Sequence, residues 1–177
     1  MTTLVFTVIG DDRAGLVDTL ASPIAAHHGS WQRSHLARLA GKFAGIVVVD
    51  VPNDEADALV ADIEAITSQG LLHARVAVAG ADNETRGSRE LHVQLVGQDR
   101  PGIVHEIARA LAARGVSIDE LETRTESASM SGEHLFHAAM SVRVPDDADP
   151  DDVQAALEHL GDEMMVDLEV ATRPQVP

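Results

Sequence analysis

The chain contains no cysteine and no tyrosine, and it has little aromatic or basic character. Its 177 residues include one Trp, three Phe and 13 Lys+Arg against 29 Asp+Glu. Without cysteine, the chain forms no disulfide, thiolate zinc site or iron–sulfur cluster, and it has no Cys nucleophile. A net charge of −16 argues against direct binding to a nucleic-acid backbone. Four aromatic side chains are also too few for base-stacking platforms.

Long apolar runs are absent as well. The first run, residues 4–9, is much shorter than the roughly 18–20 residues that cross a bilayer. It lacks the basic flank and small-residue cleavage site of a signal peptide. We therefore expect a cytoplasmic protein with no membrane contact. The 45% apolar content is that of a folded globular chain.

A ten-residue segment occurs twice in the chain. Residues 8–17 read VIGDDRAGLV and residues 95–104 read LVGQDRPGIV, with five of ten positions identical and an offset of 87. A valine–proline pair also recurs, at 51–52 and 144–145. Such self-similarity indicates a duplicated unit. The sequence predicts domains at 1–80 and 89–177, joined by a polar, glycine-containing linker at 81–88.

Each half has the same pattern of expected elements. A period of two predicts a first strand at residues 4–8 and again at 91–95. A period of four then predicts a helix in each half, carried by Leu16, Leu20 and Ile24 and by Ile103, Ile107 and Leu111. Two strands, a second helix and a last strand follow in each half. In the first half, strands are expected at 30–39, 43–51 and 74–78, and the helix carries Leu59, Ile63 and Ile66. In the second half, strands are expected at 116–125, 135–144 and 166–170, and the helix carries Val153, Leu157 and Leu160.

The predicted fold class is α+β. It consists of two ferredoxin-like βαββαβ domains, each an antiparallel four-stranded sheet with two helices on one face. Pro23 should kink or shorten the first helix, and Gly29 and Gly115 should end the first helices. A helix-free sheet face with apolar residues requires a partner. Val5, Val47 and Val49 are expected on that face in the first half. We expect the halves to pair within the chain, or with a second chain as a homodimer.

The repeated Gly-x-Asp-Arg-x-Gly sequence, at residues 10–15 and 97–102, connects the first strand to the first helix in each half. Glycine permits a bend and close backbone approach, and Asp is suited to capping free N–H groups. The helix N-terminus offers oriented amides and partial positive charge to a small carboxylate. The spacing alone leaves two interpretations open: a turn that Asp and Gly merely shape, or a ligand site.

The duplicated pattern resembles tandem ACT domains, which are small amino-acid-sensing modules. Within that family it is most similar to the glycine cleavage system transcriptional repressors. The resemblance covers residues 3–171. Its motifs are DRPGIV at 99–104, GVSI at 115–118, GSW at 29–31, ARLAGKFAGI at 37–46, the two Val-Pro pairs and the loop at 129–136.

The resemblance implies that an amino acid binds where the first turn meets a neighbouring domain. Carried over by position, the implied contacts are Asp12, Arg13, Gly15, Ser30 and Gln32 in the first half, and Asp99, Arg100, Gly102, Ser117 and Asp119 in the second. Three positions depart from the family pattern: Ser30 and Ser117 replace a common Asn, and Ala14 replaces a common Pro.

The implied function is that of a non-catalytic, amino-acid-binding regulatory protein. A small amino acid is the expected effector, without a cofactor, and the protein would act through a partner, a transcriptional regulator or an enzyme, without touching nucleic acid. Two alternatives remain open. One is a ligand-free ACT scaffold or dimerisation module. The other is the detached regulatory part of an enzyme of amino-acid metabolism, such as phosphoserine phosphatase.

Other residue patterns do not predict a catalytic or metal site. His27 and His28 are adjacent, so on a helix their side chains point about 100° apart and cannot share a metal simply. His134 and His137 have no carboxylate pair in register. We expect these histidines to be solvated or to stabilise turns. The chain also has no Gly-x-Ser-x-Gly elbow, phosphate-binding loop or His-Glu-x-x-His sequence.

Overall fold

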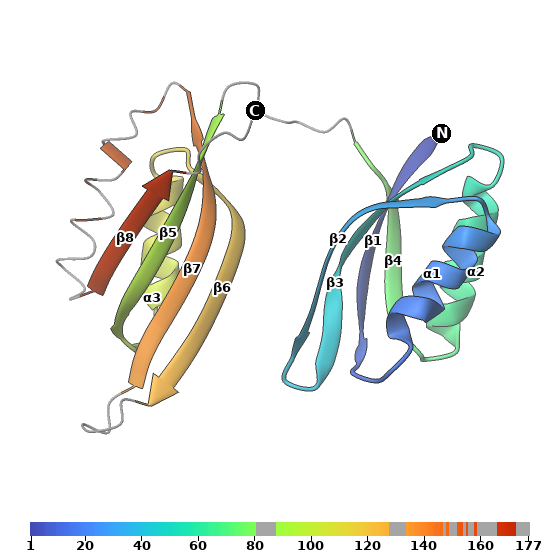
Figure 1. The fold of residues 1–177 in the computed structure, drawn as a ribbon, viewed down its shortest axis with the longest axis horizontal. Helices are drawn as coiled ribbons and strands as arrows, with labels where there is room; N and C mark the ends of the chain where they lie inside the picture. The colour runs from blue at the N-terminus through green and yellow to red at the C-terminus, as the bar shows by residue number, and fades with distance from the viewer. Residues whose placement is uncertain are drawn as a thin grey trace. The chain divides into compact units, whose positions relative to one another are not determined.

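A computed structural model describes two compact units, Met1–Asp82 and Asn83–Pro177 (Figure 1). The described residues are 1–80, 88–127, 134–146, 148, 152, 153, 155, 158 and 166–172, the last segment by its backbone. The expected linker at 81–88 lies almost entirely outside them. Each unit is considered by itself.

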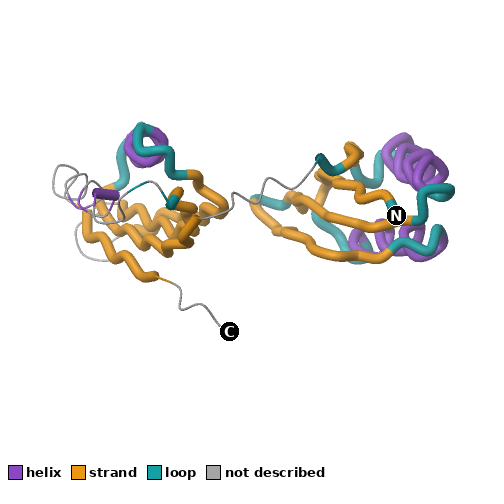
Figure 2. Tube along the Cα trace, turned by 90° about the horizontal axis from the view of Figure 1, so that it is seen from above, coloured by secondary structure: helices purple, strands orange, loops and turns teal. Residues whose placement is uncertain are grey.

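The first unit has the predicted order of elements: β1 (Thr2–Asp11), α1 (Leu16–Ala26), β2 (Ser30–Leu39), β3 (Lys42–Val51), α2 (Ala56–Ser68) and β4 (His73–Val78). Its strands pair antiparallel in the order β2-β3-β1-β4. Figure 2 shows both helices on one face of this sheet. The β2–β3 turn has positive φ at Ala40 and Gly41, as a tight two-residue hairpin requires.

The second unit repeats this topology with β5 (Ser88–Gln98), α3 (Ile103–Ala112), β6 (Ser117–Ser127), β7 (His134–Pro145) and β8 (Val166–Thr172). The antiparallel order β6-β7-β5-β8 matches the first sheet strand for strand. The predicted α+β class is therefore confirmed. Of the stripe expected for this unit's second helix, Leu157 and Leu160 lie outside the described residues. Val153 is described, and it is buried in the core.

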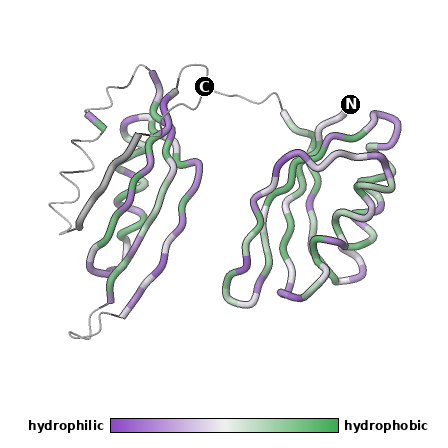
Figure 3. Tube along the Cα trace, viewed as in Figure 1, coloured by the Kyte–Doolittle hydropathy of each residue, from purple (hydrophilic) through white to green (hydrophobic). Residues whose placement is uncertain are grey.

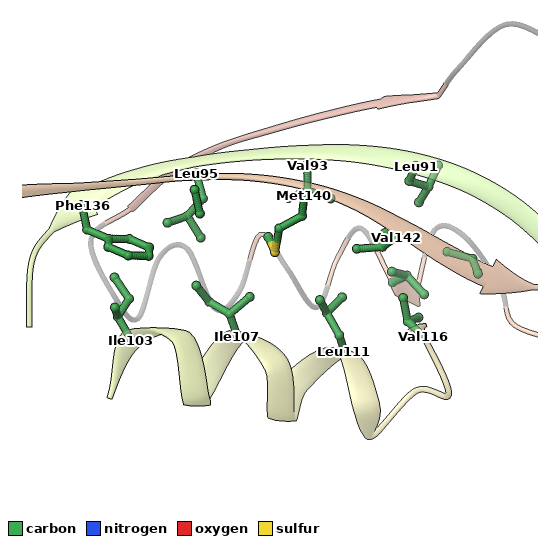
Figure 4. Packing of buried hydrophobic residues seen from close by; sticks show 13 residues of the cluster. Leu91, Val93, Leu95, Ile103, Ile107, Leu111, Val116, Phe136, Met140 and Val142 are labelled. Atoms are coloured by element: carbon green, nitrogen blue, oxygen red, sulfur yellow. The ribbon is translucent and has the colours of Figure 1, made fainter. Parts of the chain in front are cut away.

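Each unit has its own apolar core, built from the two predicted periodicities. In the second unit, Leu91, Val93 and Leu95 on alternate positions of β5 pack over the α3 stripe of Ile103, Ile107 and Leu111 (Figure 4). The first core joins Leu4, Phe6 and Val8 to the stripes of α1 and α2. Each fully buried side chain of this kind contributes about 1.5–3 kcal/mol relative to exposure.

The expectation for the helix-free face of the first unit was partly wrong. Val47 and Val49 are fully buried in the core, because β3 pairs Phe6 with Val47 and thereby places both on the helix side. The residues on the open face are Val5 and its partner Val48, together with Ile46. The run at 46–49 is apolar on both faces, so alternation could not assign it.

The end of α1 also differs from expectation. Pro23 lies inside the helix without shortening it, since α1 has 11 residues and its counterpart α3 has 10. The left-handed residue that follows α1 is His28, with φ 56°, in the place that Gly115 takes after α3. Gly29 serves a different purpose: a Cβ there would lie 2.9 Å from the Ile24 carbonyl oxygen. Glycine therefore permits close approach at this position.

Candidate functional site: the glycine-capped turns

The two Gly-x-Asp-Arg-x-Gly turns have nearly the same backbone. The N-cap residues Gly15 and Gly102 are left-handed, with φ of 92° and 91°. Glycine adopts this conformation without the strain of a side chain. The Asp12 N–H donates to the Gly41 carbonyl at 2.9 Å, and the Asp99 N–H donates to the His134 carbonyl at 2.8 Å. Each turn is thereby fixed against the neighbouring hairpin.

Neither helix that follows these turns carries a side-chain cap. The expected capping by Asp12 and Asp99 is wrong, because the first turns of α1 and α3 receive no cap hydrogen bond from a side chain. At Gly15, nothing lies within 4 Å of where a Cβ would be. The N-terminus of α1 therefore presents N–H groups and the positive end of the helix dipole at an open surface.

In the first unit, the turn arginine is bound by a backbone carbonyl and not by a carboxylate. Arg13 donates to the Leu71 carbonyl at 2.7 Å and forms no direct ion pair among the described residues, and its charge helps to lower the pKa of Asp11. Asp12 is 3.5 Å from the Arg38 guanidinium. Asp11 pairs with Lys42, whose hydrogen bond lowers the pKa of that carboxyl.

In the second unit, the equivalent arginine is neutralised. Arg100 donates to both carboxylate oxygens of Glu106, at 2.9 and 2.6 Å. These hydrogen bonds lower the pKa of Glu106 and raise the pKa of Arg100. The first unit has Thr19 at the position of Glu106, and its hydroxyl donates to the Gly15 carbonyl at 2.9 Å. The two turns thus share a backbone and differ in charge.

The strand-start residues implied by the family resemblance lie at β-bulges. The pairing register shifts between Trp31 and Arg33 in β2, and between Ile118 and Glu120 in β6. Gln32 and Asp119 are therefore the bulged residues, whose side chains such irregularities redirect. Gln32 donates to the Ser30 hydroxyl at 3.1 Å. Asp119 accepts two hydrogen bonds from Arg143, at 3.0 and 2.8 Å. Ser117 is exposed.

The structure does not bring the turn residues and the strand-start residues of one unit together. In the second sheet Gln98, beside the turn, pairs with Leu135, whereas Ser117 pairs with Arg143 at the other end of β7. Eight residues along a strand correspond to about 26 Å. The first sheet is arranged in the same way, with Asp11 and Ser30 paired to opposite ends of β3. Within one unit, the predicted contacts form two separate groups.

The sequence did not predict the residues that form ion pairs with the predicted site residues. They are Arg38, Glu106 and Arg143. The acid at position 106 was visible in the sequence, but only the folded turn shows that Arg100 reaches it. Arg38 and Arg143 come from neighbouring strands, and the register that places them has no local signal in the sequence.

A cavity of about 440 Å³ lies on the helix-free face of the second unit. It is lined by Glu90, His92, Asp119, Glu120 and Ser141. The Ser141 hydroxyl lies 3.1 Å from His92 Nδ1. Among the residues described, no three His, Asp or Glu side chains are arranged to hold a metal ion, and none of the helices is long and apolar enough to cross a membrane.

Comparisons with known proteins agree with this architecture. Two ACT-domain profiles match residues 2–76 and 92–162. The chain belongs to the ACT-domain family and carries two of these domains in tandem.

Two solved structures resemble almost the whole chain. An unknown protein from Galdieria sulphuraria is 26% identical with a TM-score of 0.84, covering 98% of this chain and 99% of that one. A candidate glycine cleavage system transcriptional repressor is 16% identical with a TM-score of 0.74, covering 98% of each chain. This second similarity shows that the two proteins share a fold. No curated protein sequence matches the chain.

Proposed function

We propose that this protein is a non-catalytic regulator that binds a small amino acid at the β1–α1 turn of its first unit. The observation that carries the proposal is the uncapped N-terminus of α1 behind the left-handed Gly15, beside an acid and a base that are adjacent in sequence, Asp12 and Arg13. Its membership of the ACT-domain family supports a regulatory role.

The turn has the groups that a zwitterion requires. Helix amides and the Arg13 guanidinium suit an α-carboxylate. Asp12 suits an α-ammonium, which would compete with the exposed Arg38 guanidinium 3.5 Å away. Arg13 has a backbone carbonyl as its partner, so a bound carboxylate would not have to displace another acid. The ligand would be small, because the turn offers charge complementarity rather than an enclosed apolar pocket.

The second unit is better suited to a scaffold role. At its turn, Glu106 already pairs with Arg100. At the separate strand start, Arg143 already pairs with Asp119. An amino acid at this turn would have to compete with a bidentate ion pair. The ligand-free scaffold, the first of the alternatives left open by the sequence, is thus the second candidate function, and it applies to this unit.

We further propose that the protein acts on a protein partner, as a repressor of the glycine cleavage type would. Its charge of −16 opposes direct contact with DNA. The similarity in fold to a candidate repressor of that type makes a transcriptional regulator one partner to test, and an enzyme of amino-acid metabolism the other.

The test is a thermal-unfolding panel of the full chain against the twenty amino acids. A ligand that binds the folded state only, at 100 times its Kd, stabilises by about 2.7 kcal/mol. We expect one or a few small amino acids to raise Tm by several degrees. Folded protein whose Tm is unchanged across the whole panel would contradict the sensing proposal and leave the scaffold.

A further inference from the structure

The β2 strand places an arginine beside the glycine-capped turn of the first unit. Arg38 pairs with Phe43 across β2 and β3, and Phe43 pairs with Gly10, the first residue of the turn motif. Cross-strand partners point to the same face of a sheet, and Phe43 packs against the first core. Arg38 therefore lies on the face that α1 covers, close to the turn that precedes α1.

An ion pair connects Arg38 to the turn itself. Its guanidinium lies 3.5 Å from Asp12, and its side chain is 72% exposed. An exposed pair at this distance is weak, so another carboxylate can replace Asp12 at little cost. The neighbouring Asp11 and Lys42 pair with each other. The hydrophilic turn between β1 and α1 is visible in Figure 3, and the contact between Arg38 and Asp12 is the part of it that a ligand can exchange.

The second unit has an uncharged residue at the position of Arg38. Thr125 pairs with Phe136, and Phe136 pairs with Gly97, so this register makes Thr125 the counterpart of Arg38. The same strands and the same turn form in both units. The fold therefore does not require a cation at this position, and Arg38 is free to serve a property of the first turn alone.

Net charge alone does not select a ligand for the first turn. Its cations and acids are equal in number, and they are Arg13, Arg38, Lys42, Asp11, Asp12 and Asp18. The selection comes from the exchange of partners. An α-ammonium that binds Asp12 displaces Arg38, and a ligand whose one carboxylate is held by Arg13 gives Arg38 nothing in return. A second carboxylate on the ligand restores the ion pair that the ammonium breaks.

From this exchange, we propose that the amino acid bound at the first turn is dicarboxylic, of the aspartate or glutamate class, and that Arg38 determines this specificity by binding the side-chain carboxylate. The α-carboxylate binds Arg13 and the helix amides, as in the proposed function on which this inference rests. Arginine suits the specificity role because its planar guanidinium binds a carboxylate through two parallel hydrogen bonds.

The experiment compares each dicarboxylic amino acid with its amide, glutamate with glutamine and aspartate with asparagine, by isothermal titration calorimetry of the full chain. In at least one pair, the acid should have a Kd about tenfold lower than the amide at low salt, and the preference should shrink at about 0.5 M salt. Arg38→Gln should reduce the preference to about twofold or less. Arg75→Gln, which removes an exposed arginine of β4, is the control and should retain the preference.

The outcomes separate this inference from the proposed function. If neutral amino acids bind as tightly as aspartate and glutamate, the turn binds amino acids but the dicarboxylic specificity is wrong. A preference that survives in Arg38→Gln would assign the second carboxylate to another residue and overturn the role of Arg38. Binding of no amino acid would contradict the proposed function and this inference together. Circular dichroism is the folding control for Arg38→Gln, whose fold should be intact because Thr125 occupies the equivalent position.

Discussion

One side chain accounts for the different pairing of the arginines in the two turns of this protein. Both turns have a left-handed glycine and an Asp–Arg pair, yet the residue four positions after the glycine is Thr19 in one and Glu106 in the other. Glutamate is long enough to bind Arg100 through two hydrogen bonds, whereas threonine folds back onto its own helix. Duplicated backbones can thus carry different charges at the same position.

This difference predicts which arginine matters for ligand binding. Arg13→Gln should abolish the amino-acid-induced rise in Tm, because the ligand carboxylate loses its cation, while Arg100→Gln should retain it. Thr19→Glu should reduce the rise in Tm by giving Arg13 a competing carboxylate. Both arginine variants keep the glycine turn, so circular dichroism serves as the folding control. Loss in Arg100→Gln with retention in Arg13→Gln would assign the site to the second unit.

At the scale of elements, a histidine connects the two helices of the first unit. His27 is the C-cap residue of α1, and its side chain is 16% exposed. Its ring nitrogens lie 2.7 Å from Glu55, the N-cap residue of α2, and 2.9 Å from Asp62 within α2. With an acceptor on each nitrogen, the imidazolium form is favoured. The hydrogen bonds that His27 donates to Glu55 and, to a smaller extent, to Asp62 raise the pKa of His27 above 6.5.

The first unit should therefore lose stability as the pH rises. A raised folded-state pKa means that the contribution of His27 is fully present below pH 6.5 and lost as pH passes the folded pKa. Denaturant unfolding should show His27→Gln to be more destabilising at about pH 6 than at about pH 8.5. His73→Gln, which changes an exposed histidine of β4, is the control. An equal loss at both pH values would show that His27 acts through packing rather than charge.

At the scale of the whole molecule, the chain carries two cores with no shared residue among those described. Each core is formed by one sheet and its own helices, so each has its own source of stability. In the second core, the predicted stripe of Val153, Leu157 and Leu160 is represented among the described residues by Val153.

Two cores predict two unfolding transitions in calorimetry at about 0.5 M salt, where charged interfaces are screened. Phe6→Ala should destabilise the first unit by about 3–5 kcal/mol and lower one transition, because it deletes a fully buried ring. Ile107→Ala should lower the other transition by about 2–5 kcal/mol. If either substitution shifted both transitions equally, the units would unfold as one cooperative block.

The elements could be predicted because their signals are local. Residues 30–39 were predicted as a strand and β2 has those bounds, since alternation and the flanking glycines define it. The open face of β3 could not be predicted, because a run that is apolar on both sides is consistent with either register. The left-handed conformation of His28 was not predicted, because the end of the helix was assigned to the neighbouring Gly29.

What the sequence determined by itself was the duplication, the order of elements and the two glycine turns, since periodicity and glycine positions act over a few residues. Only the tertiary structure decided which valines are buried, which arginine is paired, and that each unit separates its turn from its strand start. These depend on strand register and on side chains from distant segments, and the cross-strand pairing that brings them together is a property of the whole sheet.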